Sequence, residues 1–156
     1  MIIPMKTMTI LFTSLFCLQV FACIQDNSPQ QDELQQEQTT DMQLKITVGK
    51  ATFSATLQSN ATAKAFQERL PLTLTMNDLN RNEKYIDLPE RLPSNASNPG
   101  TIQNGDLMLY GSNTLVLFYK SFSTSYSYTR IGKITDPAGL AEALGSGTVD
   151  VTFELE

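Results

Sequence analysis

The stretch DLMLYGSNTLVLFYK, residues 106–120, decides the fold class of this chain. Two segments rich in strand-forming residues, Asp106–Tyr110 and Leu115–Lys120, flank the polar turn Gly111–Thr114. Leu115–Phe118 is a continuous apolar run, which is typical of a strand buried on both faces. We therefore predict two joined strands here, the second of them fully buried.

Apolar and polar residues alternate on both sides of this stretch, which predicts further strands. The first two are joined by Gly49-Lys50, a pair suited to a two-residue hairpin turn. The additional predicted strands are Leu44–Val48, Phe53–Leu57, Leu72–Met76, Tyr85–Leu88, Tyr128–Ile134 and Thr148–Glu154.

Two short helices are predicted between the strands. The first covers Ala61–Leu70, begins at the capping residue Asn60 and is stopped by Pro71. The second follows Asp136, expected to be its cap, and ends at Gly145. Many antiparallel strands with so few helices favour closure, because a barrel has no exposed edges. The predicted fold is mainly β: a closed or nearly closed antiparallel barrel of about eight strands, with the two helices capping its ends.

The first 41 residues differ in composition from the rest. Residues 1–22 resemble a signal peptide, with Lys6 as the only charge ahead of an apolar run. Val20-Phe21-Ala22-Cys23 resembles the lipobox of bacterial lipoproteins, which predicts lipid attachment at Cys23; an ordinary secretory leader is the alternative. Residues 23–41 are rich in Gln and acids and predict a flexible linker. The folded domain is then residues 42–156.

The composition excludes several chemistries. The chain has no His, which removes Ser-His-Asp triads and His-containing zinc sites. No basic cluster is present, so a nucleic-acid partner is not expected. No metal and no cofactor are predicted.

Paired carboxylates of the kind that hydrolases use are a further candidate. Glu83 could pair with Asp87 or with Asp78, but the sequence does not fix the geometry of either pair.

Four stretches of the domain resemble the bacterial cyclophilin-like domain family: Leu88–Pro93, Asn98–Leu107, Leu117–Phe122 and Tyr128–Ile134. The resemblance covers nearly all of residues 42–156 and implies a small barrel related to the cyclophilin prolyl isomerases. Isomerase activity would rest on Arg91, which precedes Pro93, and on Gln103, which precedes Asn104-Gly105-Asp106. Thr101 or Ile102 stands where the isomerases have a Phe, and no His or Trp can fill their later positions.

The segment Ser121–Tyr128 is the strongest candidate for a binding surface, because aromatic residues alternate there with small hydroxyl residues. The alternative is that its rings simply pack into the barrel. The candidate ligand-binding residues are Tyr119, Phe122, Tyr126, Tyr128 and Arg130. Arg130 could equally be a solvated strand residue or part of a structural ion pair.

Two functional hypotheses follow. The first is an exported, lipid-anchored binding module of the bacterial cell envelope, with a peptide, protein or small ligand as partner. A soluble periplasmic or secreted protein is the alternative location. The second hypothesis is a divergent peptidyl-prolyl isomerase that uses Arg91 and Gln103.

Overall fold

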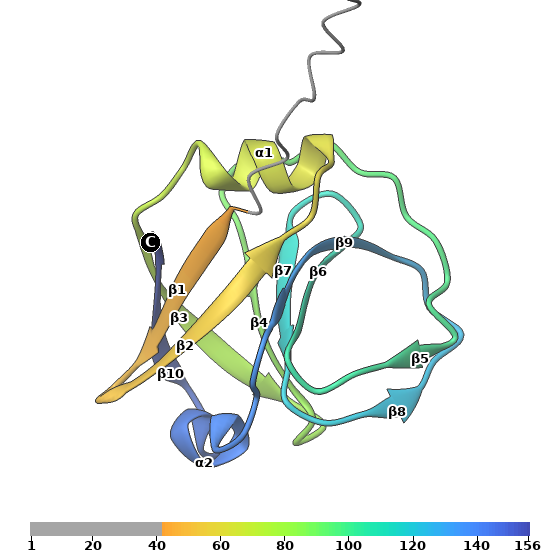
Figure 1. Ribbon diagram of the computed structural model, residues 1–156. Helices are drawn as coiled ribbons and strands as arrows, with labels where there is room; N and C mark the ends of the chain where they lie inside the picture. The colour runs from red at the N-terminus through yellow and green to blue at the C-terminus, as the bar shows by residue number, and fades with distance from the viewer. Residues whose placement is uncertain (1–41) are drawn as a thin grey trace, which may run out of the picture. The chain divides into compact units, whose positions relative to one another are not determined.

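The computed structural model describes residues 42–156, so the predicted signal peptide, Cys23 and the linker lie outside the described residues. Eight strands, all paired antiparallel, close into a barrel in the order β1-β10-β3-β4-β7-β6-β9-β2 (Figure 1). The predicted fold class is thereby confirmed. The barrel strands are β1 (Gln43–Val48), β2 (Ala51–Leu57), β3 (Leu72–Leu79), β4 (Glu83–Asp87), β6 (Asp106–Tyr110), β7 (Thr114–Phe118), β9 (Tyr128–Ile134) and β10 (Val149–Leu155).

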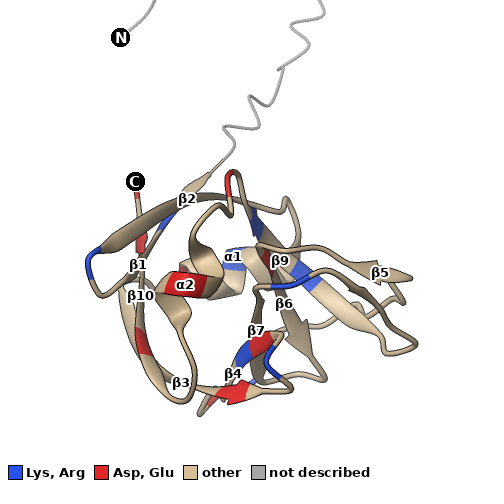
Figure 2. Ribbon diagram, turned by 90° about the horizontal axis from the view of Figure 1, so that it is seen from below, with Lys and Arg blue, Asp and Glu red and all other residues tan. Residues whose placement is uncertain are grey.

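Outside the barrel lie two helices and a small ribbon. Helix α1 (Ala61–Gln67) lies at one end of the barrel and α2 (Leu140–Leu144) at the other (Figure 1). Strands β5 (Thr101–Ile102) and β8 (Phe122–Ser123) pair with each other only, as a two-stranded ribbon. In the view of Figure 2, basic and acidic residues are interspersed along strands and loops. None of the helices in residues 42–156 has the length and apolar character needed to cross a membrane.

The hairpin β1–β2 forms as predicted. Val48 pairs with Ala51 across the turn, and Gly49 adopts the positive φ of 59° that such a turn requires. The alternate residues Leu44, Ile46 and Val48 are buried in the barrel core. Strand β1 pairs with β2 on one side and β10 on the other, so, like every strand of the closed barrel, it is hydrogen-bonded along both edges.

Strand β7 is buried on both faces, as its apolar run predicted. Leu115 and Leu117 belong to the core inside the barrel. Val116 and Phe118 belong to a second apolar cluster, which also contains Ile102, Met108 and Tyr128. Because successive side chains of a strand point to opposite faces, this second cluster lies on the outer face of the barrel, where the β5–β8 ribbon covers it.

Helix α1 begins where the sequence predicted. The Asn60 side chain accepts a hydrogen bond from the Ala63 N–H at 2.8 Å. Phe66 is fully buried, and its ring meets Phe153 edge-on with the centroids 5.6 Å apart. The helix is shorter than predicted: it ends at Gln67, whereas the sequence predicted an end at Leu70.

Two other predictions were wrong in detail. Asp136 does not cap α2: its carboxylate accepts from the Ala138 N–H, and the helix starts after Gly139, which has a positive φ. Strand β3 continues through Leu79, beyond its predicted end at Met76, because Asn77–Leu79 pairs with β4. The turn itself is confined to residues 80–82.

A buried ammonium group fastens β4 to the segment that follows α2. The side chain of Lys84 has no exposed surface. Its Nζ donates to Asp78 Oδ2 at 2.8 Å, to the Gly145 carbonyl at 2.9 Å and to the Gly147 carbonyl at 2.6 Å. Tyr119 donates its hydroxyl to the same Asp78 oxygen at 2.6 Å. All three ammonium protons thus have partners, which makes burial of the charge tolerable.

Substituting Lys84→Met should therefore destabilise the fold by about 3 kcal/mol or more, since two carbonyls lose this donor and the Asp78 carboxylate loses its positively charged partner. The matched control is Lys45→Met, which breaks an ion pair with Glu154 whose side chains are each 40% exposed. That change should cost less than about 1 kcal/mol. Denaturant unfolding of both variants measures the difference, and equal losses would contradict the assignment.

Candidate functional site

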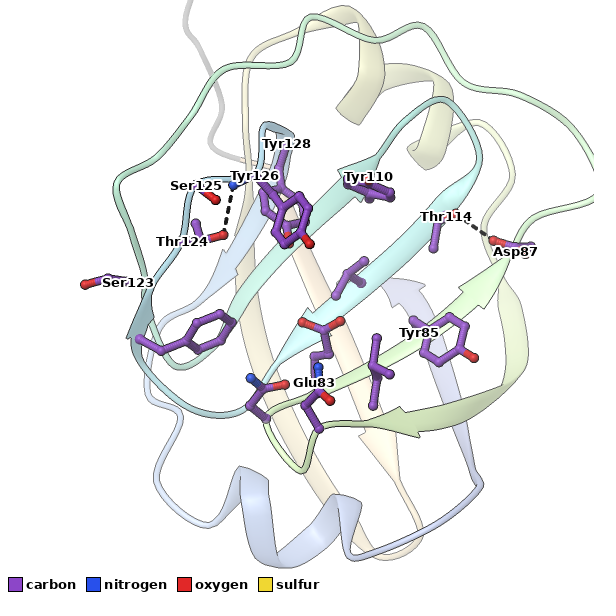
Figure 3. Close-up of a pocket in the computed structure, with 15 residues that line it drawn as sticks. Glu83, Tyr85, Asp87, Tyr110, Thr114, Ser123, Thr124, Ser125, Tyr126 and Tyr128 are labelled. Atoms are coloured by element: carbon purple, nitrogen blue, oxygen red, sulfur yellow. Dashed lines mark hydrogen bonds between the residues drawn. The ribbon is translucent and has the colours of Figure 1, made fainter.

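A pocket of about 590 Å³ lies on the outer face of the barrel, between β4, β7 and the segment that carries β8 (Figure 3). Its volume lies within the roughly 300–1,000 Å³ range of small-molecule sites. The pocket is lined by Leu79, Asn80, Asn82, Glu83, Tyr85, Asp87, Tyr110, Thr114, Val116, Phe122, Ser123, Thr124, Ser125, Tyr126 and Tyr128.

Aromatic rings form one wall of this pocket. The Tyr110 ring lies 6.0 Å from that of Tyr126, edge-on, and 5.6 Å from that of Tyr128. Tyr126 is 61% exposed, Tyr110 45% and Leu79 42%. These are three of the four large apolar side chains that residues 42–156 expose, and the fourth, Leu155, does not line the pocket. Exposed apolar groups that gather at a concavity are typical of a binding surface.

The three predicted rings of the 121–128 segment have different surroundings. Tyr128 is buried in the second apolar cluster, where its ring meets Phe118 edge-on. Phe122 packs on the same cluster and is only partly buried. Tyr126 projects into solvent at the mouth of the pocket. The segment therefore combines a packed base with an accessible ring.

Two carboxylates line the opposite side. Figure 3 shows the Glu83 carboxyl group pointing into the pocket, toward the side where Tyr126 and Tyr128 lie. Burial, followed by the nearby negative charge of Asp78, raises the pKa of Glu83 to about 7. Asp87 accepts a hydrogen bond from the Thr114 hydroxyl at 2.6 Å and is exposed.

The neighbouring carboxylate of Asp78 behaves in the opposite way. Hydrogen bonds from Lys84 and then from Tyr119 lower the pKa of Asp78 below its usual value. Burial raises the pKa of Tyr119, and its hydrogen bond to Asp78 adds to this. Burial, with the charge of Glu83 second, likewise raises the pKa of Tyr128. Asp78 therefore stays charged near neutral pH, while Glu83 changes its protonation state there.

Comparison with protein families identifies the fold. The model of the cyclophilin-like family matches residues 46–154. The chain belongs to the cyclophilin-like family. Among solved structures, it is similar to the solution structure of the hypothetical protein AF2241 from Archaeoglobus fulgidus, with a TM-score of 0.50 and 19% identity over 74% of this chain and 95% of that chain. This likeness concerns the fold alone. Comparison with curated proteins gave no match.

The residues that would carry isomerase activity in this cyclophilin-like barrel do not line the pocket. Arg91 is exposed in the loop after β4, and its carbonyl accepts a hydrogen bond from Arg69 at 2.9 Å. Gln103 is exposed in the turn before β6, and its N–H donates to Asp106 at 2.8 Å. The structure gives no support for a role of these two residues at this site.

Two other predicted binding residues also lie outside the pocket. The ring and hydroxyl of Tyr119 are buried against Lys84 and Asp78, because Tyr119 continues the inward-facing alternation of Leu115 and Leu117. Arg130 is 3.8 Å from the buried Asp106, and its side chain is 47% exposed. That position matches the structural ion pair that the sequence left open. The pocket thus unites Phe122, Tyr126 and Tyr128, but not Tyr119 or Arg130.

Two pocket residues with aromatic rings, Tyr85 and Tyr110, were not singled out from the sequence, and Glu83 and Asp87 were considered there only as a possible carboxylate pair. Glu83, Tyr85 and Asp87 lie two residues apart along β4, so all three point to the same outer face. The spacing of these three residues was visible in the sequence, but the sequence did not show which face of β4 lies beside the pocket. Tyr110 comes from the other side of β7, brought in by barrel pairing.

We expect the raised pKa of Glu83 to appear in the stability of the domain. Its folded-state value of about 7 exceeds the usual 4.5, so the folded state binds more protons between these pH values. The free energy of unfolding should therefore fall, relative to Glu83→Gln, as pH rises from about 4.5 to about 7. Denaturant unfolding at a series of pH values checks this. Glu90→Gln, outside the pocket, should follow the wild type, and a pH-independent offset for Glu83→Gln would contradict the assignment.

Proposed function

We propose that this chain is an exported, lipid-anchored cyclophilin-like module that binds a ligand in the bacterial cell envelope. The observation that carries the proposal is the pocket on the outer face of the barrel, where exposed Tyr110, Tyr126 and Leu79 gather. Solvent exposure of such rings is unfavourable unless a partner covers them. A peptide, a protein segment or a small molecule with apolar parts would do so.

Binding accounts for this pocket better than catalysis does. Among residues 42–156, the lining includes no Lys, Arg or Cys, and the only lining hydroxyl that hydrogen-bonds to a lining carboxylate is that of Thr114, which donates to the exposed Asp87. Glu83 and Asp87 are four residues apart on one strand, which separates their Cα atoms by roughly 13 Å. The two carboxyl groups of a glycoside hydrolase pair are about 5–9.5 Å apart, so the Glu83 and Asp87 side chains would have to lean toward each other along the strand to reach that separation. The pocket instead resembles binding sites in which aromatic surfaces are combined with a few polar groups.

The proposed location rests on the sequence outside the described residues. A charged start, an apolar run and the Val20-Phe21-Ala22-Cys23 motif support export followed by lipid attachment at Cys23. The acidic, Gln-rich residues 24–41 would then serve as a spacer between the anchor and the barrel.

Replacing Cys23→Ser should release the protein from membranes, because no thiol remains there to carry the lipid. The full chain is expressed in a bacterium with a labelled fatty acid, and membrane and soluble fractions are compared after a carbonate wash. Loss of label and movement to the soluble fraction are expected. The matched control is Cys17→Ser, which should remain labelled. Membrane retention of Cys23→Ser would contradict lipid anchoring.

The binding role is tested with a panel of short peptides and methyl glycosides as probes. We expect the ring resonances of Tyr110 and Tyr126 to shift first, and Tyr126→Ala to weaken binding by roughly tenfold or more, as removal of a central aromatic contact usually does. Since Tyr126 is 61% exposed, its removal should change the free energy of unfolding by less than about 0.5 kcal/mol.

The control variant for that experiment is Leu155→Ala, which removes an exposed apolar side chain outside the pocket. It should bind the probes as the wild type does. Resonance shifts scattered over the barrel, or no shift with any probe, would count against a binding pocket at this place.

A further inference from the structure

The Glu83 carboxylate lies in the pocket without a positive partner. Among residues 42–156, no Lys or Arg lines the pocket. Within residues 42–156, the salt bridges involve other carboxylates, those of Glu154, Glu90, Asp78 and Asp106. The adjacent Lys84 points to the opposite face of β4, where three acceptors take its protons. A partly buried carboxylate left in this way gains from any cation that enters the pocket.

The aromatic wall favours the same kind of ligand. The rings of Tyr126 and Tyr128 lie on the side toward which the Glu83 carboxyl points (Figure 3). The faces of such rings carry partial negative charge and attract ammonium or guanidinium groups. Asp87, at the other end of β4, adds a second negative charge to the lining.

Ligands of other charge would fit poorly. An anion would meet two carboxylates and no basic side chain in the pocket lining. A neutral apolar group would displace water from the Glu83 carboxylate and offer no hydrogen bond in place of those that the water made. A cation on an apolar stem satisfies both the carboxylate and the rings.

Extended backbone can reach this pocket along β8. This strand pairs only with β5 among the described residues, so no strand hydrogen-bonds to its other edge, and Ser123 of β8 is followed along the pocket by Thr124 and Ser125. An open strand edge offers N–H and C=O groups to an incoming peptide. The hydroxyls of the three residues supply further hydrogen-bonding groups.

We propose that the ligand of this pocket is a peptide segment that places the ammonium or guanidinium group of a Lys or Arg side chain on the Glu83 carboxylate, with its stem against Phe122 and Tyr126. The inference rests on the binding function proposed above. It assigns Glu83 the role of the charge-selecting residue and the β8 edge that of the contact for the peptide backbone.

The test uses the full chain purified in a non-ionic detergent at pH 8 and low salt, where Glu83 is ionised. Peptides of one length and sequence carry Lys, Arg, norleucine or Glu at the centre, and calorimetry measures their affinities. The Lys and Arg peptides should bind at least tenfold more tightly than the norleucine peptide, and the Glu peptide should bind most weakly. Butylammonium, which lacks a peptide backbone, should bind at least tenfold more weakly than the Lys peptide.

Two variants locate the charge contact. Glu83→Gln should abolish the preference for Lys over norleucine and leave the norleucine affinity within about twofold. Glu90→Gln, which removes the same charge from a side chain that is 81% exposed and outside the pocket, should keep the preference. A preference that survives in Glu83→Gln would overturn the assignment, because another negative region would then attract the peptides.

The outcomes separate this inference from the binding function itself. Equal affinities for the Lys and norleucine peptides, with shifts at Tyr126, would overturn the charge selection and leave a binding pocket. Equal affinities for butylammonium and the Lys peptide would overturn the peptide part. If no peptide in the series binds, the inference fails, while the binding function fails only if the separate probe panel also leaves Tyr126 unshifted.

Discussion

The burial of β7 on both faces is the constraint on which the rest of the molecule depends. Its inner residues, Leu115 and Leu117, need a closed barrel around them. Its outer residues, Val116 and Phe118, need a second layer, which the β5–β8 ribbon and Tyr128 provide. A ribbon this short covers only part of the outer face, so a hollow remains beside β4. The pocket is thus a consequence of how the second layer ends.

The alternation of side chains along β4 separates two kinds of charge. Lys84 points to one face and is fixed by Asp78 and two backbone carbonyls. Glu83, its neighbour in sequence, points to the other face and lines the pocket. One strand therefore carries a structural ion pair and an unpaired carboxylate side by side, and the negative charge of Asp78 helps to raise the pKa of Glu83. The Asp78–Lys84 ion pair that stabilises the barrel therefore also affects the charge state of the pocket, because Asp78 raises the pKa of Glu83.

Strand periodicity and turn chemistry made the barrel predictable, and the hairpin at Gly49, the cap at Asn60 and the buried run of β7 are all confirmed. The site was only partly predictable. The rings of Phe122, Tyr126 and Tyr128 could be found because they are close in sequence. Glu83 and Tyr110 come from strands joined to them only through barrel pairing, and a single sequence does not specify which strand lies next to which. Tyr119 was misleading because the same residue type serves equally well as a buried hydrogen-bond donor.

The position of β1 in the sheet has a mechanical consequence. Because β1 pairs along its length with both β2 and β10, the chain enters the barrel through a strand that is held on two sides. A load applied through the residues before Met42 and balanced at the far end of the barrel would act along both hydrogen-bonded ladders at once, and ladders loaded along their strands resist in shear. Separation of β1 from both β2 and β10 would open the barrel. The strand that carries the N-terminal connection therefore has two ladders, not one, to break before it separates from the barrel.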